Sequence, residues 1–283
     1  MNAVIVDPST LAARLAAGPV LVIDARADLA DPARGPTAHA AAHVPGAVHA
    51  DLERDLSDLS RANLGRHPLP TPAAFSALLS RWGWRPDLPV VVYDDAAGAL
   101  AAARAWWLLR AAGSADVAVL DGGYQAWHAA GLPLESGVAR PRPASAVEVD
   151  FDPSMHLDAE ALAAALATDA IVLLDARAAP RYRGEVEPID PVAGHVPGAR
   201  NRPYTDNLDA SGRFKTPDVL AAEFAALTGG HAPHEVVHMC GSGVTACHNV
   251  LAMTHAGLAG SRLFAPSWSG WIADRTRPVA TGA

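Results

Sequence analysis

The feature that most restricts the fold of this chain is an internal duplication. Four landmarks occur in both halves of the 283 residues, in the same order and at similar spacing. They are an Asp-Ala-Arg tripeptide after an apolar run (24–26 and 175–177), a His-Val-Pro-Gly-Ala turn (43–47 and 195–199), a second apolar run (90–95 and 236–240) and a third run leading to a tryptophan (117–127 and 262–271). Such self-similarity indicates two copies of one structural unit.

Each half alternates short β-branched runs with Ala- and Leu-rich segments. The predicted helices are 73–81, 99–111, 158–167 and 218–227. This alternation predicts an α/β fold with two tandem domains, each a mainly parallel sheet flanked by helices. Closely spaced prolines within 135–153 predict an extended linker. We therefore expect domains at 1–140 and 150–283, with the boundary near residue 145.

Composition restricts the classes of partner. The net charge of −8 argues against binding to nucleic acid or to an anionic membrane surface, since both need a basic face. No apolar stretch approaches the ~20 residues that span a bilayer. The first residues lack the basic and apolar segments of a signal peptide. Two cysteines seven positions apart form no disulfide framework, so we expect a reducing, cytoplasmic setting.

The strongest chemical signal is Cys240, which ends the apolar run 236–240. Gly241, Ser242 and Gly243 follow, and the apolar stretch 244–253 is typical of a helix. A thiol at a strand-to-helix turn faces unpaired backbone N–H groups and the positive end of the helix dipole. This environment favours the thiolate, so the sequence predicts a nucleophilic cysteine.

The first half carries no cysteine at the corresponding place. Alignment of the repeats puts Asp95 opposite Cys240. A carboxylate cannot carry a sulfur atom or attack as a thiolate does. We therefore expect the first domain to be catalytically silent. Because ligands bind at the carboxyl ends of the strands in open α/β sheets, it could supply one wall of the cleft.

These motifs together resemble the two-domain rhodanese superfamily of sulfurtransferases. The neutral loop Cys-Gly-Ser-Gly-Val-Thr resembles 3-mercaptopyruvate sulfurtransferases, whereas thiosulfate sulfurtransferases usually carry a basic pair after the cysteine. The resemblance implies a persulfide on Cys240, formed from a small sulfur donor and discharged to a thiol, such as thioredoxin, or to cyanide. It implies no metal or organic cofactor. The loop residues that would bind the transferred sulfur are Gly241, Ser242, Gly243, Val244 and Thr245.

An arginine is expected to bind the anionic end of the donor. Arg181 matches the arginine that has this role in the family. Mercaptopyruvate enzymes generally carry a second arginine in the loop before the Gly-His pair, but residues 185–193 of this chain contain none. Either Arg183, Arg200 or Arg202 takes its place, or one arginine suffices. The donor preference is therefore open at this point.

The resemblance also implies a proton relay beside Ser242. The matching positions are His67 and Glu53, the latter replacing an aspartate. A relay is chemically sensible because loss of sulfur from mercaptopyruvate generates an enolate that needs a proton. A surface histidine is the simpler alternative for His67.

Other residues favour structural roles. His43 and His195 recur in both halves, which indicates turn histidines bonded to the backbone. Arg177 is expected to make a structural ion pair, because Arg26 repeats it in the silent half. Histidines near Cys240 do not match zinc-ligand spacing.

Three alternatives remain for the function. They are thiosulfate sulfurtransferase activity, a non-enzymatic persulfide carrier and, least favoured, a cysteine phosphatase, which needs an arginine where this chain has Ala246.

Overall fold

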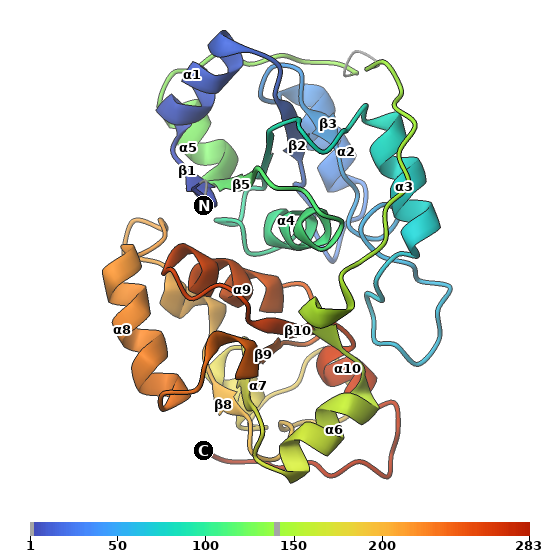
Figure 1. The fold of residues 1–283 in the computed structure, drawn as a ribbon, viewed down its shortest axis with the longest axis vertical. Coiled ribbons are helices and arrows are strands. Elements are labelled where there is room, and N and C mark those ends of the chain that lie inside the picture. Colours follow the sequence, from blue (N-terminus) through green and yellow to red (C-terminus); the bar gives the residue numbers. More distant parts are fainter. Residues whose placement is uncertain (1–2, 139–141) are drawn as a thin grey trace. The chain divides into compact units, whose positions relative to one another are not determined.

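The computed structural model describes residues 3–138 and 142–283 and divides into two compact units (Figure 1). The first contains the chain up to Asp58 and Leu69–Asp152, and the second contains Leu59–Pro68 and Pro153–Ala283. Residues 139–141, which include the predicted domain end at residue 140 and part of the predicted linker, lie outside the described residues.

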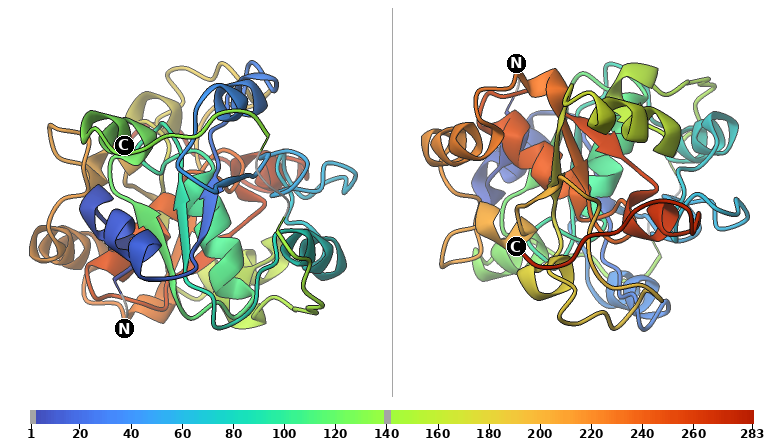
Figure 2. Two further views of the ribbon diagram at one scale, coloured as in Figure 1. Left: turned by 90° about the horizontal axis from the view of Figure 1, so that it is seen from above. Right: turned by 90° about the horizontal axis from the view of Figure 1, so that it is seen from below.

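The first unit is a parallel five-stranded sheet with helices on both faces (Figures 1 and 2). Its strands are β1 (Ile5–Val6), β2 (Leu21–Asp24), β3 (Val48–His49), β4 (Val90–Tyr93) and β5 (Val117–Leu120), in the spatial order β1-β5-β4-β2-β3. Its helices are α1 (Pro8–Ala17), α2 (Arg34–Ala41), α3 (Pro72–Arg81), α4 (Ala102–Ala111) and α5 (Gly123–Ala129). Leu11 of α1 and Trp127 of α5 share one core cluster with Val22 and Val91. Helix α4 packs on β4 and β5.

The second unit repeats this plan. Its strands are β6 (His156–Leu157), β7 (Val172–Asp175), β8 (Arg200–Asn201), β9 (Val236–Met239) and β10 (Arg262–Phe264), in the order β6-β10-β9-β7-β8. Its α-helices are α6 (Ala159–Ala167), α7 (Ala179–Tyr182), α8 (Pro217–Thr228), α9 (Ala246–His255) and α10 (Ser267–Trp271), and its short 3-10 helices are η1 (Pro153–Met155), η2 (Tyr204–Asn207) and η3 (Pro233–Glu235). All strand pairs are parallel. The predicted α/β architecture is confirmed.

The predicted helices form where local capping favours them. Thr71 accepts a hydrogen bond from the backbone N–H of Ala74 and precedes a proline at the first helical position, so α3 begins at Pro72. Asp158 caps α6 in the same way through Ala161. No helix among the described residues is long and apolar enough to cross a membrane.

The duplicated motifs have the same contacts in both units. The guanidinium of Arg26 binds the Asp24 carboxylate at 2.5 Å, and that of Arg177 binds Asp175 at 2.7 Å. Each ion pair is buried. Each arginine also donates to a backbone carbonyl in the segment before its turn, Ala42 or Gly194, at 2.7 Å. These arginines therefore have the structural role predicted for them.

The turn histidines are also structural. The Nδ1 atom of His43 lies 2.7 Å from the carbonyl oxygen of His39, and that of His195 lies 2.8 Å from the carbonyl oxygen of Tyr182. The predicted backbone bonding of both rings is confirmed.

Strand register corrects one assignment. Asp24 pairs with Tyr93 in the first sheet, and the equivalent Asp175 pairs with Met239 in the second. Tyr93 is thus the counterpart of Met239, and the residue opposite Cys240 is Asp94 rather than Asp95. The alignment of the two apolar runs was wrong by one position because β-branched residues repeat in both and leave the register unspecified.

Candidate functional site

Cys240 lies directly after β9, at the carboxyl edge of the second sheet, and is 2% exposed. The backbone N–H of Gly243 donates to its Sγ at 3.1 Å. Gly243 has a φ of +79°, and a Cβ there would lie 2.2 Å from the carbonyl oxygen of Ala265. Only glycine fits this position. Backbone geometry therefore requires a glycine at position 243 of the cysteine loop.

The equivalent loop of the first unit holds an anionic side chain. The buried carboxylate of Asp94 accepts hydrogen bonds from four backbone N–H groups at 2.7–3.2 Å, those of Ala96, Gly98, Leu100 and Ala102. Burial raises the pKa of Asp94, and these bonds oppose that rise. The predicted helix at 99–111 starts only at Ala102, whose N–H is the last of these four donors. A strand-to-helix loop of this fold can therefore surround an anion with N–H donors.

The other predicted loop residues surround the cysteine differently. The carbonyl of Gly241 accepts from the N–H of Ser269 at 3.0 Å, which ties the loop to α10. Val244 is buried, and Thr245 precedes α9 without a side-chain capping bond. Ser242 is 7% exposed, and its hydroxyl points to a histidine.

That histidine is His67. Its Nδ1 atom lies 2.8 Å from the Oγ of Ser242, and its side chain is buried. The residue is in the Leu59–Pro68 segment, which packs with the second unit although the chain on both sides belongs to the first. The structure therefore brings His67 and Ser242 together, and the alternative of a surface histidine is wrong.

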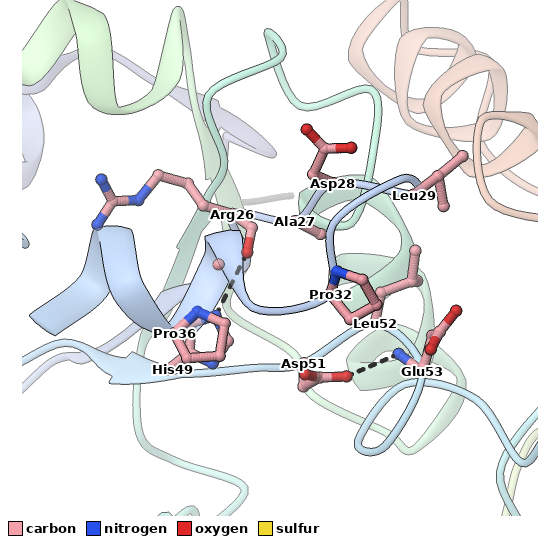
Figure 3. Close-up of a pocket in the computed structure, with 11 residues that line it drawn as sticks. Arg26, Ala27, Asp28, Leu29, Pro32, Pro36, His49, Asp51, Leu52 and Glu53 are labelled. Atoms are coloured by element: carbon pink, nitrogen blue, oxygen red, sulfur yellow. Dashed lines mark hydrogen bonds between the residues drawn. The ribbon is translucent and has the colours of Figure 1, made fainter.

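Glu53 belongs to the first unit, so its pairing with His67 stays a prediction. It lines a small hollow of that unit together with Asp28, His49 and Asp51 (Figure 3). Its backbone N–H donates to Asp51 at 3.0 Å. The pKa of His49 is lowered by burial, which favours a neutral ring.

Arg181 is on α7, and its guanidinium is held by two buried carboxylates. It donates to Glu187 at 2.6 and 3.2 Å and to Asp190 at 3.3 Å. Burial alone would raise the pKa of Glu187, but hydrogen bonds from Arg181 and from the backbone outweigh it and lower the pKa. Both Nη atoms of Arg181 lie 3.6 Å from the point where a Cβ on Gly241 would stand. The predicted anion-binding arginine is thus adjacent to the cysteine loop.

A second arginine at the loop was missed by sequence reasoning. The Nη2 atom of Arg66 lies 2.9 Å from the same Cβ point on Gly241, and its Nη1 atom binds Asp190. Arg66 directly precedes His67 in the sequence, and the predicted place of His67 beside Ser242 was the signal that could have found it.

The three arginines considered as substitutes lie elsewhere. Arg183 binds Glu185, Arg200 donates to the carbonyl of Leu227, and Arg202 binds Glu223 and Asn207.

The histidine nearest to the cysteine in sequence is also engaged. His238 lies 3.2 Å from the sulfur of Met253 through Nε2, and burial lowers its pKa to about 3, so the ring is neutral. Across residues 3–138 and 142–283 there is no group of three or more His, Cys, Asp or Glu side chains that could hold a metal ion. Cys247, on α9, is buried, and its thiol donates to the carbonyl of Gly243 in the cysteine loop at 3.4 Å.

Fold and site together define a two-domain protein with one cysteine loop at a sheet edge. Residues 7–130 and 158–274 match the model of the rhodanese-like domain. The chain belongs to the rhodanese family, and it contains two copies of the domain.

Named relatives of similar length are sulfurtransferases. A Pseudomonas aeruginosa protein proposed to be a 3-mercaptopyruvate sulfurtransferase is 52% identical, and the match covers 99% of each chain. A Mycobacterium tuberculosis protein for which thiosulfate sulfurtransferase activity is proposed is 42% identical, over 99% of this chain and 97% of its own.

Solved structures agree. The 3-mercaptopyruvate sulfurtransferase of Escherichia coli has a TM-score of 0.81 at 32% identity, with 95% of this chain and 100% of that one covered. That of Leishmania major has a TM-score of 0.84 at 34% identity, with 94% and 73% covered.

Proposed function

We propose that this protein is a 3-mercaptopyruvate sulfurtransferase that moves a sulfane sulfur to a thiol or cyanide through a persulfide on Cys240. The observation that carries the proposal is the Cys240 thiol, which accepts a hydrogen bond from the N–H of Gly243. Its loop also contacts His67 through Ser242 and lies next to the guanidinium groups of Arg66 and Arg181. Its 52% identical relative supports the same donor.

In the first half-reaction, the Cys240 thiolate attacks the donor's sulfur. The new S–S bond forms as the carbon–sulfur bond breaks, and the electron pair of that bond passes to carbon as the enolate of pyruvate. The enolate takes a proton at C3 to give pyruvate. Ser242, bonded to His67 at 2.8 Å, is placed to deliver that proton.

In the second half-reaction, an acceptor nucleophile attacks the outer sulfur of the persulfide. Cyanide leaves as thiocyanate, a thiol leaves as its own persulfide, and Cys240 returns as thiolate. The loop from Gly241 to Thr245 holds the persulfide anion with its N–H donors, as the equivalent loop of the first unit holds the Asp94 carboxylate.

Arg181 binds the donor carboxylate in this scheme, because its guanidinium lies next to Gly241. The first domain does no sulfur chemistry, since its loop holds Asp94 in place of a cysteine. The physiological setting is the cytoplasm, with thioredoxin among the candidate acceptors and with neither a nucleic acid nor a membrane partner.

A second candidate is thiosulfate as the donor. Residues 185–193 contain no arginine, and the 42% identical relative carries that proposed activity. The paired Ser242 and His67 favour mercaptopyruvate instead, because sulfite is a stable leaving group that needs no proton.

The test is kcat/KM for both donors on one preparation, with cyanide as the acceptor. We expect a preference for 3-mercaptopyruvate, and a preference for thiosulfate contradicts the proposed donor. Cys240→Ser is the matched control, because it removes the nucleophile and keeps the size of the side chain. Persulfide that accumulates on this variant contradicts the role of Cys240.

A further inference from the structure

Ser269, on α10, bonds to two segments of the site at once. Its N–H donates to the carbonyl of Gly241 at 3.0 Å, and its Oγ accepts from the N–H of Arg66 at 3.0 Å. Gly241 directly precedes Ser242, and Arg66 directly precedes His67. Ser269 therefore holds the residue before each member of the Ser242–His67 pair.

These contacts form a closed circuit around the pair. The Oγ of Ser242 lies 2.8 Å from Nδ1 of His67, and both residues are buried. From Ser242 the circuit runs back along the backbone to Gly241, across to Ser269, and through the N–H of Arg66 to His67. A shift at Ser269 is therefore passed to the distance between the two side chains.

The backbone of the segment Leu59–Pro68 fits closely against α10 beside these bonds. Gly65 has a φ of +89°, and a Cβ there would lie 2.4 Å from the carbonyl oxygen of Pro266 and 3.1 Å from the Oγ of Ser269. A Cβ on Gly270 would lie 3.2 Å from the backbone nitrogen of Gly65. Glycines at both positions therefore let the two backbones approach closely enough for the hydrogen bond to Ser269.

The equivalent turn of the first unit is built differently. By strand register, Gln125 and Ala126 correspond to residues 269 and 270 of the second unit. The side chain of Gln125 donates to the carbonyl of Asp95, the counterpart of Gly241, at 2.9 Å. In the second unit the backbone N–H makes this bond instead, which leaves the hydroxyl of Ser269 for the segment that carries His67.

We propose that Ser269 is a positioning residue for sulfur transfer, which fixes Ser242 and His67 at the distance that proton delivery to the enolate requires. The inference rests on the proposed function and deepens it, because it names what holds the proton-delivering pair in place. Ser269 acts through the pair and not on the donor itself. Its effect on the rate should therefore exist only while the pair is intact.

The test is a double-mutant cycle in the full chain, with kcat/KM for 3-mercaptopyruvate as the readout. Ser269→Ala keeps the backbone bond to Gly241 and removes the acceptor of the Arg66 N–H. We expect it to lower kcat/KM at least about tenfold, because a misplacement of about 1 Å can cost about a hundredfold in rate. In the Ser242→Ala background there is no pair to position, so the same substitution should cost less than about threefold.

A merely structural role gives a different result. If the hydroxyl only stabilises α10, Ser269→Ala has the same effect in both backgrounds, and that outcome overturns the inference. Ser269→Thr retains the hydroxyl and should stay within about threefold of wild type, whereas a loss as large as that of the alanine variant contradicts the role of the hydroxyl. Ser211→Ala is the control, since it removes a hydroxyl that bonds Asp209 on an exposed turn and should leave kcat/KM unchanged.

A second variant decides the matter if Ser269→Ala does not fold. Gly65→Ala places a Cβ against the carbonyl of Pro266 and displaces the same segment from the other side. Its cost should be at least about threefold larger in the wild-type than in the Ser242→Ala background, and equal costs overturn the inference. Failure of the proposed function is seen separately, in a wild-type enzyme that does not turn over 3-mercaptopyruvate.

Discussion

Replacement of Ser242 by alanine separates proton delivery from anion binding. The Oγ of Ser242 lies 2.8 Å from Nδ1 of His67, and the two residues are 7% and 5% exposed. Bulk water is therefore poorly placed to replace the hydroxyl as a proton source. A positioned acid contributes about 10²–10⁴-fold to a rate. We expect Ser242→Ala to lower kcat/KM for 3-mercaptopyruvate at least about a hundredfold, which corresponds to about 2.7 kcal/mol of activation free energy.

Thiosulfate provides the internal control. Its leaving group is sulfite, which needs no proton, so kcat/KM for thiosulfate should change by less than about threefold. In a two-step covalent mechanism, kcat/KM for the donor reports only the first half-reaction, so the acceptor does not enter the comparison. His67→Gln should act in the same direction on the same donor.

Ser242→Ala also loses the buried hydrogen bond between Ser242 and His67. We expect this loss to cost about 1–3 kcal/mol of unfolding free energy, so the melting temperature is measured beside the kinetics to show that the variant is folded at the assay temperature. An equal fall of kcat/KM for both donors refutes proton delivery by Ser242, because the hydroxyl would then stabilise the bound anion in both reactions.

Three further predictions concern stability. Gly243→Ala should lower the unfolding free energy by clearly more than the ~1–2 kcal/mol expected for the left-handed backbone alone, because its Cβ meets a carbonyl, whereas Gly257→Ala, at a φ of +80° with open space around it, should cost only that amount in a chemical denaturation experiment. Asp94→Ala should cost at least about 3 kcal/mol of unfolding free energy, because two buried and two partly buried N–H groups lose their acceptor. Asp95→Ala should cost less than about 1 kcal/mol, because its partner arginine is half exposed, and should leave sulfur transfer almost unchanged. Folding lowers the pKa of Glu187, so the stabilisation that this carboxylate provides is present above its ordinary pKa of 4.5 and is lost as the pH falls through the folded value. Glu187→Gln should therefore reduce the slope of unfolding free energy against pH between about pH 5 and 3. An unchanged slope contradicts this assignment.

The sequence by itself determined the fold, because its signals are local. Alternating apolar runs and helical segments specify parallel strands joined by helices, and the repeated motifs specify two copies. The thiol and its loop were also readable, since a strand, a cysteine and two closely spaced glycines are contiguous in the chain. Arg181 was identified from a short motif in the same domain.

The tertiary structure decided which residues reach that loop beyond His67, which the family resemblance had already indicated. Arg66 belongs by sequence to the first half, yet its segment packs with the second unit, and the local composition of the segment does not show that packing. The register that puts Asp94 opposite Cys240 likewise depends on pairing between strands, because runs of β-branched residues fit a sheet in more than one alignment. Contacts between residues far apart in the chain follow from the packing of whole elements, so this sequence specified the nucleophile while the fold assembled the groups around it.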